Sequence, residues 1–202
     1  MSTLAFNLVV IVGTAALGAE PAKEPVGSVH VECHGQLRHG VVAIGGETTG
    51  TTITFDQMTW ELKLPDDPSR ELAQQHHKKR VCVVGTLRQV AGTTIPLRWI
   101  IDVERISAVD GASPKAGTTA IIRGILHAAD NKNESSPMVI DAAGMKWPLD
   151  LGDTASNIHA KSLVGKSVIA RGRVERTIDE KSPPKPILCV RELKTHDSSK
   201  SP

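Results

Sequence analysis

The sequence predicts an all-β protein built from two tandem copies of one small domain, with one short helix in each copy. Val, Ile and Thr recur in short runs, and glycine occurs 17 times in 202 residues, which favours strands over long helices. The heptapeptide MTWELKL at 58–64 returns as MKWPLDL at 145–151, 87 positions later. The chain therefore repeats one strand-rich unit.

The repeat extends well beyond this heptapeptide. Residues 52–110 align with residues 139–197 without a gap, and this alignment matches Trp60 with Trp147. Two copies are too few for a solenoid, in which each unit needs stacked neighbours. We therefore expect each copy to close its own hydrophobic core, without one continuous sheet running through both copies.

Each copy has the pattern of three strands, a helix and two more strands. Gly124 lies inside the first strand of the second copy, which suggests a bulge or a bend. The first copy matches the second, and its helix is expected to use Asp67 as N-cap and to end in the basic stretch 76–80. In the second copy we expect strands at 118–129, 138–141, 145–151, 165–177 and 187–193, and a helix from Asp153 or Thr154 to about Leu163.

The tryptophans are predicted to be core residues. Trp147 shares one strand face with Met145 and Leu149, because alternate residues of a strand point to the same side. Trp60 has the same setting in the first copy, and Trp99 alternates with further apolar residues. A ligand platform remains the alternative for Trp60 and Trp147, but a large ring with apolar same-face neighbours favours the interior.

The order of elements carries a resemblance. The stretches KKRVCVVG at 78–85 and LVGKSVIARG at 163–172 look like a passage from a helix into a fourth strand. A helix between the third and fourth of five strands resembles the oligonucleotide/oligosaccharide-binding (OB) fold over about residues 28–197. The resemblance implies two tandem five-stranded Greek-key barrels, and small exported bacterial proteins with OB-type domains are the nearest group.

The N-terminus has the layout of a secretory signal peptide. No charged residue occurs from Leu4 to Leu17, the stretch is too short to span a bilayer, and small residues follow at Gly18 and Ala19. We expect cleavage after Gly18 or Ala19, a secreted or periplasmic protein, and no stable membrane insertion afterwards. The expected organisation is a signal peptide at 1–19, a flexible segment at 20–27, OB-like domains at 28–108 and 118–197 around a linker at 109–117, and a disordered tail at 198–202.

Charge and ring content argue against a nucleic-acid partner. Lys and Arg number 24 against 22 for Asp and Glu, so the net charge is only +2. The chain has two Phe, three Trp and no Tyr, so few rings are available to stack on bases. We therefore keep single-stranded nucleic-acid binding as a second alternative only.

One cluster suggests a metal site. His30, Glu32 and His34 share a strand face, and two imidazoles with a carboxylate suit zinc or copper, with His76 or His77 as further ligands. Alternate strand residues lie about 7 Å apart, however, which is far for one small ion. A solvated polar face is the preferred interpretation, and we assign no metal ligand.

The remaining candidates are three cysteines and a basic strand. Cys33 and Cys82 are expected on neighbouring strands but facing opposite sides, which disfavours a disulfide and leaves the question open. Cys189 is expected to be a small strand residue. Arg171 and Arg173 share a face and suit an anionic ligand, although a solvated surface is preferred because an acid follows on the same face.

No motif indicates an enzyme. Phosphate loops and dinucleotide fingerprints are absent from the sequence, so we predict no catalytic residue, no cofactor-binding residue and no cofactor. The preferred function is an exported non-enzymatic binding or scaffold protein for a peptide, glycan, envelope polymer or protein partner, of unknown oligomeric state. It would use the 1–2 loops, the 4–5 loops and the strand 2–3 face. A metal-binding protein or metalloenzyme using His30, Glu32 and His34 is the first alternative.

Overall fold

The computed structural model describes residues 27–42, 47–92, 97–109, 116–128, 137–177 and 185–196. The expected signal peptide and the expected C-terminal tail lie outside the described residues, and so does most of the expected linker. Within the described ranges, no helix has the length and apolar character needed to cross a membrane. Export stays a prediction.

Both copies contain the expected order of elements, and the second copy repeats the first. β3 and β8 begin with the matched residues Met58 and Met145. One boundary differs from expectation, because the first strand of the second copy already begins at Gly117, inside the expected linker. The first copy contains β1 (Ser28–His39), β2 (Thr51–Phe55), β3 (Met58–Lys63), α1 (Asp67–Gln75), β4 (Arg80–Ala91) and β5 (Leu97–Ala108). The second contains β6 (Gly117–His127), β7 (Val139–Ala142), β8 (Met145–Asp150), α2 (Thr154–Ser162), β9 (Ser167–Arg176) and β10 (Pro186–Thr195).

The N-cap of α1 is Asp66, so the prediction of Asp67 was wrong by one residue. The Asp66 carboxylate accepts a hydrogen bond of 2.9 Å from the backbone N–H of Ser69, three residues later, as an N-cap requires. Asp67 is the first helical residue. Asp153 caps α2 in the same way, as expected, and accepts from the N–H of Ser156 at 2.7 Å.

Each copy closes a circuit of five strands. In the first copy β1 pairs with β2 and with β4, while β3 joins β2 to β5 and β5 returns to β4. The second copy repeats this circuit with β6 to β10. One pair in each circuit is parallel, β3 with β5 and β8 with β10. The expected five-stranded OB-like barrel is confirmed.

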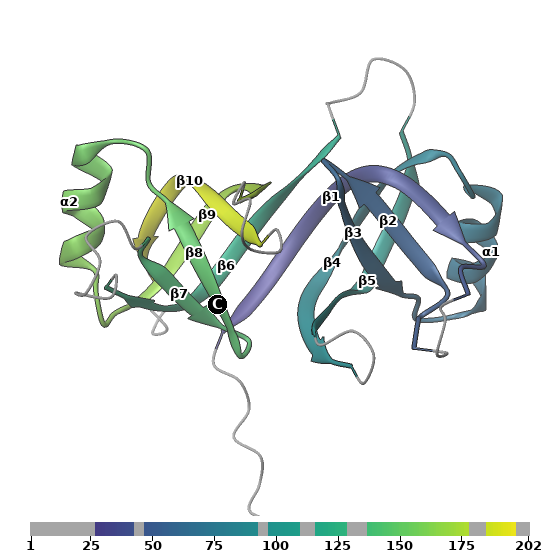
Figure 1. Cartoon of the computed structure of the whole chain (residues 1–202), viewed down its shortest axis with the longest axis horizontal. Helices are drawn as coiled ribbons and strands as arrows, with labels where there is room; N and C mark the ends of the chain where they lie inside the picture. Colours follow the sequence, from purple (N-terminus) through teal and green to yellow (C-terminus); the bar gives the residue numbers. More distant parts are fainter. Residues whose placement is uncertain are drawn as a thin grey trace, which may run out of the picture.

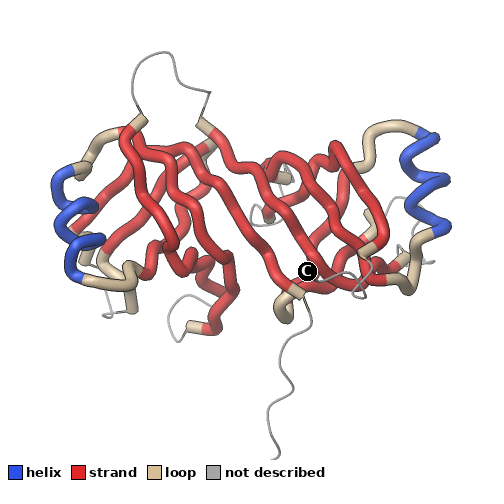
Figure 2. Tube along the Cα trace, turned by 180° about the vertical axis from the view of Figure 1, so that it is seen from behind, coloured by secondary structure: helices blue, strands red, loops and turns tan. Residues whose placement is uncertain are grey.

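The two barrels are not separate sheets, and here the prediction was wrong. β1 and β6 pair antiparallel, from Ser28 opposite Arg123 to His34 opposite Gly117, and they run side by side through the centre of the molecule (Figures 1 and 2). β2 covers only residues 36–39 of β1, and β7 covers only the last part of β6, so each first strand keeps an open edge. The two open edges satisfy each other's backbone groups.

The hydrophobic cores also merge. Trp60 is 2% exposed and Trp147 is 1% exposed, which confirms their core positions, but the buried residues of both copies form one cluster. Trp99 links them, with its ring centre 6.3 Å from Trp60 in its own barrel and 5.6 Å from Trp147 in the other. The inner faces of β1 and β6 lie on the same side, since buried Val31 is opposite buried Ala120. The expectation of two separate cores is therefore corrected.

Candidate functional site

The outer side of the shared sheet forms a polar surface that spans both barrels. Alternation places apolar residues of β1, β6 and β9 inside and their polar neighbours outside. We call this surface, on β4, β1, β6 and β9 with the adjoining part of β10, the junction face. α1 and α2 lie at the opposite ends of the molecule, away from it (Figure 1). Its outward side chains on β1, β6 and β9 include His30, Glu32, His34, Thr119, Ile121, Arg123, Arg171, Arg173 and Glu175.

Three hollows lie along the junction face. The first, of about 280 Å³, lies between His34 on β1 and two arginines of the other barrel, Arg173 and Arg191. The second, of about 250 Å³, is lined by His30 and Arg123 among others. The third, also of about 250 Å³, again includes Arg173 and Arg191. Each hollow is therefore bordered by at least one guanidinium group.

The arginines of the junction face differ in whether a neighbouring carboxylate already pairs with them. Arg173 donates to Asp56 at 3.1 Å, and because Asp56 belongs to the β2–β3 turn, this ion pair ties the two barrels together. Arg171 lies 3.9 Å from Glu192. Arg123 and Arg191 are exposed and form no ion pair with any residue that the structure describes. Sequence reasoning noticed the arginines of β9 but missed these two, because they stand alone in the sequence.

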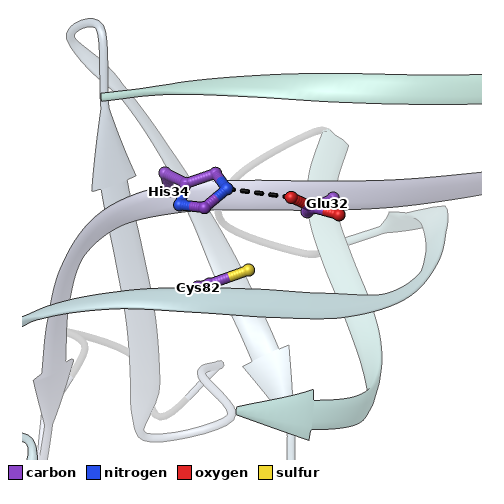
Figure 3. Close-up of side chains that lie close together, drawn as sticks. All are labelled: Glu32, His34 and Cys82. Carbon is purple, nitrogen blue, oxygen red and sulfur yellow. Dashed lines mark hydrogen bonds and ion pairs between the residues drawn. The ribbon is translucent and has the colours of Figure 1, made fainter. Parts of the chain in front are cut away.

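The predicted histidine cluster is only partly assembled. His34 and Glu32 meet, with 2.9 Å between Nε2 and Oε1, whereas His30 turns to Glu104, with 3.5 Å between Nδ1 and Oε1. The third member is Cys82, which lies opposite His34 on β4 (Figure 3). One ligand atom from each of Glu32, His34 and Cys82 lies within 4.8 Å of the others. The three residues of the alternative metal set, His30, Glu32 and His34, are therefore not brought together, and Cys82 lies beside Glu32 and His34 instead of His30.

The other two suggested histidines lie elsewhere. His77 Nδ1 accepts a hydrogen bond of 3.1 Å from the backbone N–H of His39. His76 is the C-cap of α1, and neither histidine belongs to the cluster of Glu32, His34 and Cys82. Their expected role at the end of the helix fits this position better than metal binding does.

The three cysteines are free thiols in distinct settings. Cys33 faces the core and Cys82 faces outward, as the alternation of their strands predicted, so no disulfide can join them. Burial raises the pKa of both thiols, so at neutral pH neither is a reactive thiolate. Burial also raises the pKa of Cys189, on the outer face of β10, to about 11.

The strand 2–3 face of the first barrel has its charges paired internally. Arg98 donates to both carboxylate oxygens of Glu61, at 2.7 and 2.6 Å, and Lys63 lies 3.6 Å from Asp102. Phe55 and the three tryptophans pack in or against the core, so no exposed Phe or Trp ring is found among the described residues. The 1–2 and 4–5 loops were expected at 45–51, 130–137, 91–95 and 178–186, and of these ranges residues 45–46, 130–136, 93–95 and 178–184 lie outside the described residues.

Replacing Glu61 with glutamine should make the free energy of unfolding depend less on pH in the acid range. The hydrogen bonds from Arg98 hold the pKa of the Glu61 carboxyl below its usual range. A pKa depressed by folding adds stability above the unfolded value of about 4.3, and this stability is lost as pH falls through the folded pKa. We expect Glu61→Gln to lower the free energy of unfolding by about 2 kcal/mol at neutral pH.

The measurement is urea unfolding of the native protein and of this variant at neutral pH and at about pH 3. The difference between them should shrink at the acid end. The control is Glu104→Gln, whose half-exposed carboxylate should contribute less than about 0.5 kcal/mol. A difference between native protein and Glu61→Gln that stays constant with pH would contradict the assignment.

Comparison with known proteins gives structural neighbours only. No protein-family model matches the chain, and no curated protein matches it. Two solved structures of the single-stranded DNA binding protein from Thermus aquaticus are similar in fold, each at 12% sequence identity. The structure of a deletion mutant of that protein has a TM-score of 0.53 and matches 87% of this chain and 98% of its own. The wild type has a TM-score of 0.52 and matches 87% and 96%.

These neighbours overturn two predictions. The sequence favoured an exported binder of a peptide, glycan, envelope polymer or protein, and it disfavoured nucleic acid as a partner. Both neighbours are structures of a protein that binds single-stranded DNA. Net charge does not exclude such a partner, because it sums over the whole chain, whereas a ligand responds to the local field. On the junction face, Arg123 and Arg191 are such local charges. The prediction that the chain is not an enzyme is untouched and stays a prediction.

Proposed function

We propose that this protein binds single-stranded nucleic acid across the junction face. The observation that carries the proposal is the joined pair of five-stranded barrels, an architecture that matches single-stranded DNA binding proteins over nearly the full length of their chains. OB barrels bind single strands along a positively charged groove. A single nucleic-acid strand lying across the shared sheet would contact both barrels at once.

The available cations support this location. Arg123 and Arg191 border different hollows and have no ion-pair partner among the described residues, so each can contact a phosphate without breaking a protein contact. The charged groups of the strand 2–3 face are different, because Arg98 is held by both oxygens of Glu61. Phosphate binding there would first require that pair to break. The junction face is therefore the better surface for an anionic chain.

No Phe or Trp ring is exposed among the described residues, and this affects how the protein would hold a nucleic acid. Base stacking on aromatic side chains contributes about 1–3 kcal/mol per base in many single-strand binders. Here guanidinium planes and phosphate contacts have to supply most of the affinity. Binding should consequently weaken steeply with salt, since phosphate contacts release counterions.

Substituting the two unpaired arginines should reduce both affinity and salt dependence. For single strands the slope of log K against log salt is roughly −0.7 per phosphate contact, so Arg123→Gln and Arg191→Gln should each make it less negative by about 0.7. The measurement is fluorescence anisotropy with a labelled oligo-dT of about 32 nucleotides, enough for two OB folds, at several salt concentrations.

The control variant is Arg70→Gln, an exposed arginine on α1 at the far end of the first barrel (Figure 1). It should leave both the affinity and the salt slope unchanged, and a duplex of matched length should bind more weakly than the single strand. Absence of single-strand binding at low salt would overturn the proposal. Equal losses in Arg70→Gln and Arg191→Gln would overturn the location on the junction face.

A further inference from the structure

We propose that Glu32, His34 and Cys82 form a binding site for a zinc ion, with one coordination position open toward the first hollow. The three side chains supply a carboxylate oxygen, an imidazole nitrogen and a thiol sulfur, all ligands that zinc accepts in proteins. Zinc sites with three protein ligands keep a fourth position for water or another small ligand. The inference is independent of the proposed nucleic-acid function.

The geometry is close to what zinc requires. Bond lengths of about 2.0–2.3 Å place the ligand atoms of a tetrahedral site roughly 3.3–3.8 Å apart. The ligand atoms of this cluster already lie within 4.8 Å of one another, so small side-chain rotations are enough. The Nε2–Oε1 distance of 2.9 Å between His34 and Glu32 would open by a few tenths of an ångström as the metal replaces the hydrogen bond.

The site is held by rigid backbone on two paired strands. Glu32 and His34 are alternate residues of β1, and Cys82 lies directly opposite His34 on β4 in the antiparallel register. Figure 3 shows the Glu32 carboxylate beside the imidazole of His34 and the Cys82 sulfur on the neighbouring strand below them. Sites on strands keep their ligands in place better than sites on loops.

The imidazole of His34 is held loosely enough to accept a metal ion at Nε2. Its Nδ1 is buried without a hydrogen-bond partner in the described part of the chain, so the contact of Nε2 with Glu32 is the one hydrogen bond that orients this ring. Glu32 and His34 also line the first hollow, which gives an ion and its water access from solvent. With the thiol deprotonated on binding, one thiolate and one carboxylate neutralise Zn²⁺, so the partly buried site carries no net charge.

The second copy provides an internal comparison. The first strands of the two copies align with a shift of 89 positions, so Glu32 and His34 correspond to Ile121 and Arg123. Cys82 corresponds to Ile169 by the shift of 87, and none of these three residues binds zinc readily. The site therefore belongs to the first barrel only. The expected stoichiometry is one zinc ion per chain.

The test is zinc titration by calorimetry of the full-length, chelator-treated protein under reducing conditions, without nucleic acid. Cys82→Ser and His34→Gln should each weaken zinc binding at least about tenfold. Matched controls are Cys189→Ser, a thiol on β10, and His30→Gln, an imidazole on the same face of β1 that contacts Glu104 instead. Both controls should bind zinc like the native protein.

Cobalt substitution identifies the sulfur ligand directly. Co²⁺ should give a thiolate charge-transfer band that disappears in Cys82→Ser and persists in Cys189→Ser, and circular dichroism of the metal-free variants shows whether they fold. The proposal is overturned if the native protein takes up no stoichiometric zinc, or if Cys82→Ser binds it unchanged. Equal loss in His30→Gln and His34→Gln would overturn this ligand set. None of these outcomes depends on nucleic-acid binding, so the two proposals fail separately.

Discussion

Replacing Trp147 with alanine is expected to lower the free energy of unfolding by about 3–5 kcal/mol. Its ring is 1% exposed and fills the core of the second barrel. It also lies edge-on to Trp99 of the first barrel, with 5.6 Å between ring centres and 65° between their planes. Removing it leaves a cavity at the point where the two barrels meet, so the loss should affect both copies.

Trp147→Phe is the matched control for this cavity. The Nε1 donor of Trp147 is buried without an acceptor among the described residues, and a buried unpaired donor costs about 1–3 kcal/mol. Phenylalanine removes that donor while it keeps part of the ring volume. We expect a cost below about 1.5 kcal/mol, because the lost packing is partly offset by the lost polar group.

Equilibrium urea unfolding, followed by tryptophan fluorescence and by circular dichroism, measures both variants. The shared sheet and the shared core predict a single transition with coincident curves for the native protein and for Trp147→Phe. Two separate transitions would contradict the shared core, since they would show that the barrels unfold independently. A cost below about 1 kcal/mol for Trp147→Ala would contradict the buried position of the ring.

The barrels were predictable from sequence because their signals are local. Trp60 and Trp147 alternate with apolar residues at period two, and this pattern alone assigns a strand its inner face. The repeat strengthened these predictions, since an element with a weak sequence signal in one copy is supported by the matching element in the other. Asp66 was missed as the cap because Asp66 and Asp67 are both good N-cap residues, and only the structure shows that Asp66 accepts the hydrogen bond from Ser69.

The junction was not predictable because strand pairing at an open edge leaves no mark on the hydrophobic pattern. β1 would show the same alternation whether its free edge faced water or β6, since pairing lies in the plane of the sheet and burial lies perpendicular to it. The two cores merge because β1 pairs with β6, so the shared core could not be predicted either. Trp99 carried one available hint, because a third tryptophan has no counterpart at the corresponding position of the second copy.

In the candidate metal cluster, too, residues near in sequence were found and the residue from a distant strand was missed. Glu32 and His34 were found because they are near in sequence, whereas Cys82 comes from another strand. Its outward direction was correctly predicted from its neighbours Val81 and Val83, but it was used only to judge a disulfide. Combining that direction with the OB strand order, in which β1 and β4 are adjacent, would have placed the thiol beside His34.

Gly124 is the position where the junction and the second barrel meet, and replacing it with alanine should cost about 3 kcal/mol. β6 pairs with β1 up to Arg123 and with β7 from Ile125 onward, so Gly124 lies at the change of partner. A Cβ there would lie 2.2 Å from the carbonyl oxygen of Asp141. That oxygen is backbone of β7 and cannot rotate away. The strand must shift, which opens the barrel.

Gly144→Ala is the control that separates this overlap from backbone strain. Gly144 has a φ of +74° in the β7–β8 turn and no atom within 4 Å of an added Cβ, so only the left-handed conformation is penalised, by about 1 kcal/mol. Thermal and urea unfolding of the two variants give the comparison. If Gly124→Ala is no more costly than Gly144→Ala, β7 does not approach β6 this closely. If it is about 3 kcal/mol less stable than the native protein, glycine is required there because the first strand of the barrel has to bend away from the shared sheet.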